Sequence, residues 1–215
     1  MQQTGGNEES YNTILRPGRG EYEEKRSRFL AQALPIESAT EASEQLARIR
    51  REHYDARHHC SAWVLGQRRE EKKASDDGEP SGTAGLPILK VIESRGCTNT
   101  LIVVTRYFGG TLLGTGGLVR AYTEAAQRAL LDAGIVCMRS GELLEIQMDY
   151  GMLSRVRYWL EKEGIQTVGI EYTDVVVCRV IVPSAGCSAV REKMQALGAG
   201  SIAVRTLERG FYGFS

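Results

Sequence analysis

The sequence lacks the features that mark several common protein classes. Its 215 residues include five cysteines, an odd number without a Cys-x-x-Cys pair, so neither a disulfide framework nor a zinc-site spacing is present. We therefore expect buried free thiols in a reducing compartment. No apolar run reaches membrane-spanning length, and the polar residues 1–9 do not have the composition of a signal peptide. These absences predict a cytoplasmic protein with no membrane span.

The chain also lacks net charge. Lysine plus arginine and aspartate plus glutamate both total 27, and neither half of the chain is strongly basic. This balance argues against a high-affinity, nonspecific coat for nucleic acid. Basic clusters remain at residues 25–28, 48–51 and 68–69, and we interpret them as solvated surface.

The most unusual stretch is residues 105–122, which we call the glycine-rich segment. The β-branched run of residues 101–105 predicts a buried strand immediately before it. Beyond it, Leu118, Ala121, Tyr122 and Ala125 recur at helical spacing. Between strand and helix, five glycines fall within nine residues: Gly109, Gly110, Gly114, Gly116 and Gly117. The predicted order is therefore strand, glycine-rich loop and helix N-terminus.

Two interpretations of the glycine-rich segment remain open. Glycine lets another group approach the main chain closely, and free N–H groups in the first turn of a helix bind anions. Arg106 and Arg120 flank that turn and supply further donors. The alternative is a tightly folded loop that packs against a neighbouring element. The segment is not a P-loop, because no Gly-Lys-Ser/Thr follows, and it lacks the spacing of a dinucleotide fingerprint.

Residues 75–85, the acidic segment, form the second unusual stretch. Asp76, Asp77 and Glu79 offer hard oxygen ligands for a divalent cation. The same acidic residues are also typical of Asx turns and helix caps, which need no ligand. We favour capping and assign no metal site. Ser81 has no nearby His–Asp arrangement in the sequence, and His58 is typical of a core or edge histidine. We therefore assign no catalytic residue and no cofactor.

Periodicity predicts an α+β protein with two domains, residues 13–138 and 142–209. In the first, Ser38 and Glu41 form a capping box at the start of a helix, and residues 67–73 form a charged loop. Residues 139–142 resemble a boundary. The remainder shows a βαββαβ pattern, which is typical of a ferredoxin-like domain.

The chain resembles the YigZ/IMPACT family. The matching motifs are residues 25–29, 56–62, 75–85 with 87–89, and 98–99, 103–110 and 113–122, in the family's order. The resemblance implies an N-terminal domain of the ribosomal-protein/GHMP-kinase-like α+β fold. It also implies a smaller C-terminal ferredoxin-like domain, similar to the last domain of elongation factor G. One motif departs from the family. Arg57 and His59 replace the Thr and Asn of the usual Thr-His-Asn-Cys, so only His58 and Cys60 match the family motif.

The resemblance further implies a role in regulating translation. Eukaryotic members of the family bind the ribosome-associated activator of an amino-acid-starvation kinase and thereby act in a stress response. Bacterial members have been proposed to bind nucleic acid or the translation machinery. The family therefore supplies a class of partner that composition and spacing do not.

Three functional hypotheses follow. The leading one is a noncatalytic regulatory protein that contacts the ribosome, a translation factor or RNA. The alternative is an enzyme or switch that depends on a nucleotide or phosphate ligand at the glycine-rich segment. A third is single-stranded RNA binding on the C-terminal sheet, with stacking from Tyr158, Trp159 or Tyr172. The predicted binding residues are His58, Asp76, Asp77, Glu79, Ser81, Arg106, Tyr107, Gly109, Gly110, Gly114, Thr115, Gly116, Gly117 and Arg120.

Overall fold

The computed structural model describes residues 10–214, which fold into two compact units, residues 11–137 and residues 138–214. Residues 1–9, whose polarity underlies the expectation of no signal peptide, lie outside the described residues. No helix within residues 10–214 is long and apolar enough to cross a membrane. The expected mixed α+β class and two-domain organisation are confirmed.

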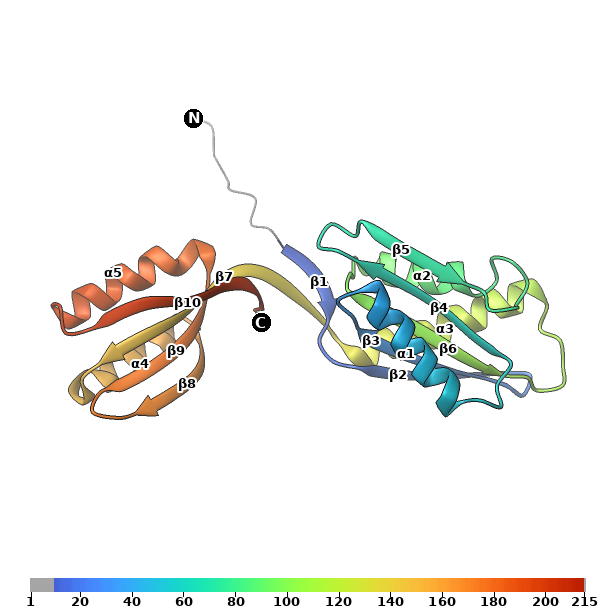
Figure 1. Cartoon of the computed structure of the whole chain (residues 1–215), viewed down its shortest axis with the longest axis horizontal. Helices are drawn as coiled ribbons and strands as arrows, with labels where there is room; N and C mark the ends of the chain where they lie inside the picture. Colours follow the sequence, from blue (N-terminus) through green and yellow to red (C-terminus); the bar gives the residue numbers. More distant parts are fainter. Residues whose placement is uncertain (1–9, 215) are drawn as a thin grey trace, which may run out of the picture. The chain divides into compact units, whose positions relative to one another are not determined.

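An antiparallel sheet with the strand order β2-β3-β6-β4-β5 forms the centre of the N-terminal unit (Figure 1). Its strands, in that order, are Gly18–Glu24, Ser27–Pro35, Thr100–Tyr107, His58–Leu65 and Glu71–Ser75. The apolar run seen in the sequence becomes β6, which is buried because it pairs on both edges and is covered on both faces.

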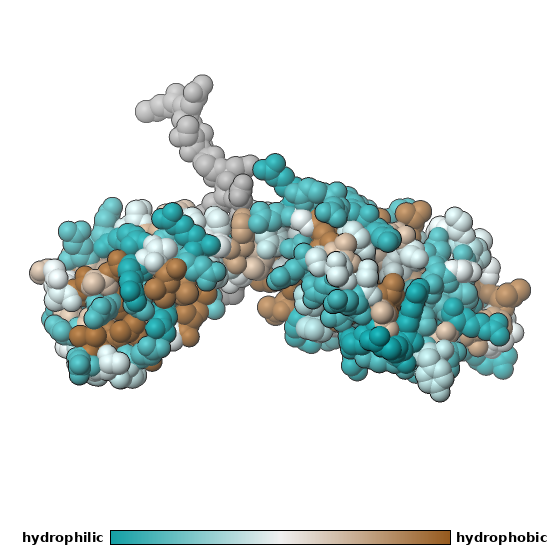
Figure 2. Space-filling model, viewed as in Figure 1, coloured by the Kyte–Doolittle hydropathy of each residue, from teal (hydrophilic) through white to brown (hydrophobic). Residues whose placement is uncertain are grey.

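Helices cover both faces of this sheet. Figure 1 shows α1 (Ala39–Glu52) on one face and α2 (Gly85–Ser94) with α3 (Gly114–Ala133) on the other. The Ser38 side chain accepts a hydrogen bond from the Glu41 amide at 3.2 Å, which is the N-cap half of the expected capping box. The Glu41 carboxylate accepts from the Glu37 amide at 2.7 Å instead of from Ser38. Figure 2 shows a largely hydrophilic surface over α1, as expected for a helix that buries only one stripe.

One strand of this sheet was not expected from the sequence. Residues 71–75 lie within the stretch interpreted as a charged loop and turn, yet they form β5 and pair with β4, with Lys73 opposite Trp63. β5 is an edge strand, and its first residues, Glu71 to Lys73, are exposed on both faces. Such a strand carries no apolar alternation, so periodicity alone does not reveal it.

The C-terminal unit is an antiparallel sheet in the order β10-β7-β9-β8, packed against α4 and α5. This order is that of the ferredoxin-like βαββαβ layout. The strands β7, β8, β9 and β10 span Ile135–Met148, Gln166–Tyr172, Val176–Pro183 and Ala203–Gly213. The helices α4 and α5 span Leu153–Lys162 and Cys187–Gly198, after the short turns η1 (Tyr150–Met152) and η2 (Ser184–Gly186). β1 (Ser10–Ile14) is the neighbour of β7 in the strand order.

The two units divide between residues 137 and 138, close to the boundary expected at residues 139–142, but the chain continues there as a strand. These residues belong to β7 and pair with β10, and Gly141 also pairs with Pro183 of β9. A Cβ on Gly141 would lie 2.9 Å from the Val182 carbonyl oxygen. The glycine therefore permits close packing within a strand, whereas its sequence context resembles a turn.

Candidate functional site

A cleft of about 440 Å³ lies in the N-terminal unit where the acidic and glycine-rich segments meet. We call it the Arg106 cleft. It is lined by Arg57, His58, Glu79, Pro80, Arg106, Phe108, Leu112, Leu113, Gly114, Thr115 and Leu118. The two unusual stretches of the sequence, which are 20 residues apart, are thus brought side by side.

Strand register places the central residues of the cleft. Arg106, near the end of β6, lies opposite His58 on β4 and Phe29 on β3. Residues directly opposite one another share a face of the sheet, and this is the face that carries α2 and α3. Tyr107 points to the other face, where its hydroxyl lies 3.1 Å from Asp55 Oδ1 and 2.9 Å from His53 Nδ1. Tyr107 is therefore not part of the cleft.

A buried ion pair links the two segments. Arg106 Nη1 donates to Glu79 Oε1 at 2.6 Å, and the side chains of Arg106 and Glu79 are only 7% and 4% exposed. The Tyr122 hydroxyl donates to the same carboxylate oxygen at 2.8 Å, and Cys60 Sγ donates to the Tyr122 oxygen at 3.3 Å. Glu79 is thus compensated inside the protein, which supports the structural interpretation of this residue.

Aromatic rings flank the remaining part of the Arg106 guanidinium. Its central carbon lies 5.4 Å from the centroid of the Phe29 ring and 5.6 Å from that of Phe108. Its Nε atom is buried and has no hydrogen-bond partner within residues 10–214. One guanidinium nitrogen is thus paired, while another retains an unused donor.

Asp76 caps α2 from outside the helix. Its carboxylate accepts hydrogen bonds from the backbone N–H groups of Gly82, Ala84 and Gly85 at 2.8, 3.0 and 2.8 Å. Burial alone would raise the pKa of Asp76, but these three hydrogen bonds outweigh it and lower the pKa. The capping interpretation is confirmed for Asp76, and the described residues contain no cluster of three or more metal-ligating side chains.

Asp77 fixes the start of β4. Its Oδ2 accepts from the His59 amide at 2.7 Å, its Oδ1 pairs with Arg50 at 2.6 Å, and its carbonyl oxygen lies 2.9 Å from His58 Nδ1. His59 is buried, and burial lowers its pKa because the charged imidazolium loses solvation. Asp77 and His59 therefore serve the fold, whereas His58 reaches the cleft.

The sequence predicted that all five glycines lie in a loop before the helix, but only Gly109 and Gly110 precede α3. Gly114, Thr115, Gly116 and Gly117 form the first turn of α3 itself. Gly109 is required because a Cβ there would overlap the backbone of Arg26 and Ser27. Gly110 adopts a left-handed φ of +83° in the preceding turn.

Comparisons with known proteins agree with this architecture. The Impact N-terminal domain matches residues 25–130, and a domain of unknown function, DUF1949, matches residues 146–201. The IMPACT family member YvyE of Bacillus subtilis is 36% identical over 191 residues, which cover 89% of this chain and 88% of the relative. This chain belongs to the IMPACT family. The IMPACT family member YigZ of Escherichia coli is 35% identical, with coverage of 86% and 91%. A crystal structure titled as that of a hypothetical protein is 33% identical and has a TM-score of 0.59. The match covers 93% of this chain and 98% of that protein.

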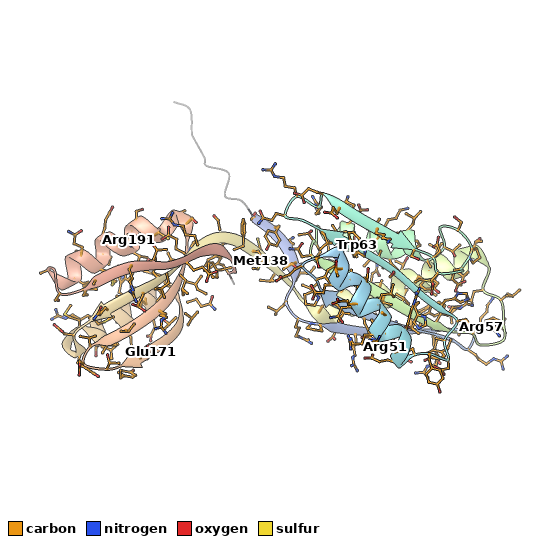
Figure 3. The ribbon with its side chains drawn as sticks, viewed as in Figure 1. Arg51, Arg57, Trp63, Met138, Glu171 and Arg191 are labelled. Atoms are coloured by element: carbon orange, nitrogen blue, oxygen red, sulfur yellow. The ribbon has the colours of Figure 1, made fainter. Side chains whose placement is uncertain are left out.

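Within this IMPACT chain, the cleft contains residues that the sequence did not single out. Arg57 is exposed at the cleft, and Figure 3 labels it near the start of β4, whereas Arg51 lies on α1. Phe108 and Leu112 are also exposed, by 52% and 82%, and line the same cleft. All three lie inside segments that the sequence marks as unusual or family-like, residues 56–62 and 105–122, but the predicted site lists other residues of those segments.

Several predicted residues of the IMPACT chain do not line the cleft. Ser81 and Arg120 are exposed elsewhere on the N-terminal unit, and neither side chain makes a hydrogen bond or ion pair within the part of the chain that the structure describes. The other predicted residues outside the lining are Asp76, Asp77, Tyr107, Gly109, Gly110, Gly116 and Gly117. The predicted set thus divides into residues that line the cleft and residues that support it or lie beyond it.

The aromatic residues of the third hypothesis do not lie together on the open face of the C-terminal sheet, because Tyr158, which is 69% exposed, and Trp159 belong to α4. Tyr172 is 58% exposed, but it lies opposite Val176 of the core and therefore faces the helix side of the sheet. Trp159 packs against the core, as its helical spacing indicated. The opposite face of the sheet carries ion pairs instead, including Arg179 with Glu171 at 2.6 Å; Figure 3 labels Glu171 on β8.

Proposed function

We propose that this protein is a noncatalytic binding protein of the translation machinery that holds its partner at the Arg106 cleft. Membership of the IMPACT family supports the link to translation. The observation that carries the choice of surface is the composition of the cleft. It combines exposed Arg57, the N-terminus of α3 and the exposed apolar side chains of Phe108 and Leu112. Positive charge beside exposed apolar area is typical of a surface that recognises a charged partner.

Rigid elements support this surface from below. Arg106 and His58 lie at the ends of paired strands, and the ion pair with Glu79 ties the acidic segment to β6. Asp76 fixes the same segment to the start of α2. When exposed groups are held on a rigid scaffold, binding loses less conformational entropy. The buried polar groups thus stabilise the cleft, while the exposed groups are the ones that contact a partner.

The chemistry of the nearby nucleophiles weighs against an enzyme. Burial raises the pKa of the Cys60 thiol to about 12, so the thiolate is not populated at neutral pH. Burial also raises the pKa of Tyr122. The hydroxyl of Thr83 donates to the Pro80 carbonyl at 2.6 Å, so its proton is directed to a backbone acceptor and not to a catalytic base. We therefore favour binding over catalysis at the Arg106 cleft.

Co-sedimentation with ribosomes tests this proposal. We expect the wild-type protein to co-sediment at low salt, and Arg57→Glu to weaken the association about tenfold because it reverses a charge at the contact surface. Arg51→Glu is the matched control, since Arg51 is also exposed, lies outside the cleft and has no ion pair within residues 10–214. Failure of the wild-type protein to co-sediment, or equal weakening by both variants, would contradict the proposal.

A further inference from the structure

We infer that the Arg106 cleft accepts one nucleotide unit, with its phosphate at the N-terminus of α3 and its base against Phe108 and Leu112. The inference rests on the proposed function in one respect, because it takes the same cleft as the contact surface. It adds the chemical group that the cleft recognises. A free nucleotide and a nucleotide within single-stranded RNA both present that group.

The N-terminus of α3 opens into the cleft through Gly114 and Thr115. Leu113 occupies the N-cap position and provides no side-chain cap to this end of the helix within the described residues. The first N–H groups of a helix have no acceptor in the preceding turn, and the helix dipole adds positive potential there. Together these features favour a phosphate at this end of α3.

Gly116 is a glycine that the fold does not require. Its φ is not in the left-handed region, and a Cβ built on it would meet no atom within 4 Å. By contrast, Gly114 has a φ of +71°, and a Cβ on Gly117 would lie 3.0 Å from the Leu113 Cβ. Glycine destabilises a helix relative to alanine. A bare main chain at Gly116 is therefore best explained by close approach of another group.

Arg106 provides an observation that is independent of the helix end. Its side chain lines the cleft although it is only 7% exposed, and its Nε is buried without a hydrogen-bond partner within residues 10–214. Buried polar groups are normally paired, so an unpaired guanidinium N–H beside a cleft indicates a missing acceptor. Phosphate oxygens are acceptors that suit the planar fork of arginine.

The charges around the cleft leave room for an anion. Glu79 also lines the cleft, but its carboxylate is compensated by Arg106 and by the Tyr122 hydroxyl. Arg57 is exposed and forms no ion pair within the described part of the chain. The cleft therefore has an excess of positive charge, to which the N-terminus of α3 contributes.

The apolar part of the cleft fits a base. Phe108 is 52% exposed and Leu112 is 82% exposed, whereas Leu118 is buried behind them. An exposed aromatic ring is a stacking surface for any nucleobase. The cleft volume of about 440 Å³ lies within the range of small-ligand sites. Inorganic phosphate alone would leave this apolar surface uncovered.

Equilibrium titration of the full chain with three probes tests the inference. The probes are inorganic phosphate, AMP and a short single-stranded oligoadenylate, and we expect AMP to bind about tenfold more tightly than inorganic phosphate because its base stacks. Tighter binding of the oligonucleotide than of AMP would identify RNA as the source of the nucleotide, and similar binding would identify a free nucleotide. Equal binding of AMP and inorganic phosphate would overturn the inference, as would binding of neither.

Two substitutions separate the phosphate and base contacts. Phe108→Ala should weaken AMP binding about tenfold and leave phosphate binding unchanged. Gly116→Ala should weaken both about tenfold, while the melting temperature rises because alanine favours the helix. The matched control is Gly151→Ala in η1 of the other unit, where a Cβ also meets no atom within 4 Å. Wild-type AMP affinity in both Phe108→Ala and Gly116→Ala would overturn the inference.

Ribosome co-sedimentation distinguishes this inference from the proposed function. If ribosome binding requires Arg57 but none of the three probes binds, the proposed function stands and the nucleotide inference is wrong. If AMP binds with the expected effects of Phe108→Ala and Gly116→Ala but ribosomes do not bind, the inference stands and the proposed function is wrong.

Discussion

The acidic segment and the first turn of α3 border the same cleft, but their polar groups have different partners. In the acidic segment, Asp76 caps α2, Asp77 holds the start of β4, and Glu79 pairs with buried Arg106. At the start of α3, no side chain caps the helix among the described residues, and Gly116 has open space around it. The carboxylates have partners inside the fold, whereas the helix end faces the cleft.

This difference shows how an unusual sequence should be interpreted. Both segments have unusual sequences that resemble the family, and either could be interpreted as a binding site. Buried polar groups must be paired, so the decisive question is whether their partners lie inside the protein. For Asp76 and Glu79 they do, which makes these residues supports of the cleft. For the α3 N-terminus and Arg106 Nε, the described chain supplies no partner.

The largest expected effect tests the structural half of the comparison. Glu79→Ala should lower the free energy of unfolding by about 3–5 kcal/mol, because it leaves Arg106 buried without its counter-charge. Denaturant unfolding of the full chain measures this change. Glu93→Ala is the control, since Glu93 pairs with Lys72 at the surface, with side chains 37% and 41% exposed. A surface pair contributes less than about 1 kcal/mol, so equal effects would contradict the buried-pair interpretation.

An intermediate effect is expected at Asp76. Asp76→Ala removes the acceptor for three backbone N–H groups and should cost about 2 kcal/mol at pH 7. The pKa of Asp76 is lowered in the folded state, so its stabilisation is present above its ordinary value of 3.8 and is lost as pH falls through the lower, folded value. Acid unfolding of wild type and variant should therefore converge in this range. Parallel curves would mean that Asp76 does not titrate with folding.

The sequence predicts those parts of the fold that local patterns define. The capped start of α1 and the alternation of the ferredoxin-like unit depend on residues close together in the chain, and both are confirmed. β5 and residues 139–142 depend on pairing with distant strands, which local periodicity does not contain. The 20-residue separation of the two segments likewise hides their contact until β4 and β6 pair.

The alternation of side chains along β6 separates two residues of the predicted site. Arg106 and Tyr107 are consecutive residues of β6, and side chains alternate between the faces of a strand. The strand predicted from the sequence ends at residue 105, so this alternation becomes apparent only because β6 extends to Tyr107. The roles of Arg57 and Phe108 could not be derived in this way, because they depend on where two turns meet.

The smallest effect on stability is expected at Arg120, the second arginine that flanks the glycine-rich segment. Unlike Arg106, it is exposed on α3 and makes no ion pair within residues 10–214, so Arg120→Glu should change the free energy of unfolding by less than about 0.5 kcal/mol. Ribosome co-sedimentation should weaken severalfold, and less than in Arg57→Glu, because Arg120 lies outside the cleft lining. Arg68→Glu, between β4 and β5, is the exposed control and should bind as the wild type does. A loss of stability comparable to that of Glu79→Ala would assign Arg120 to the supporting residues. Wild-type association by Arg120→Glu, with loss in Arg57→Glu, would confine the contact surface to the cleft itself.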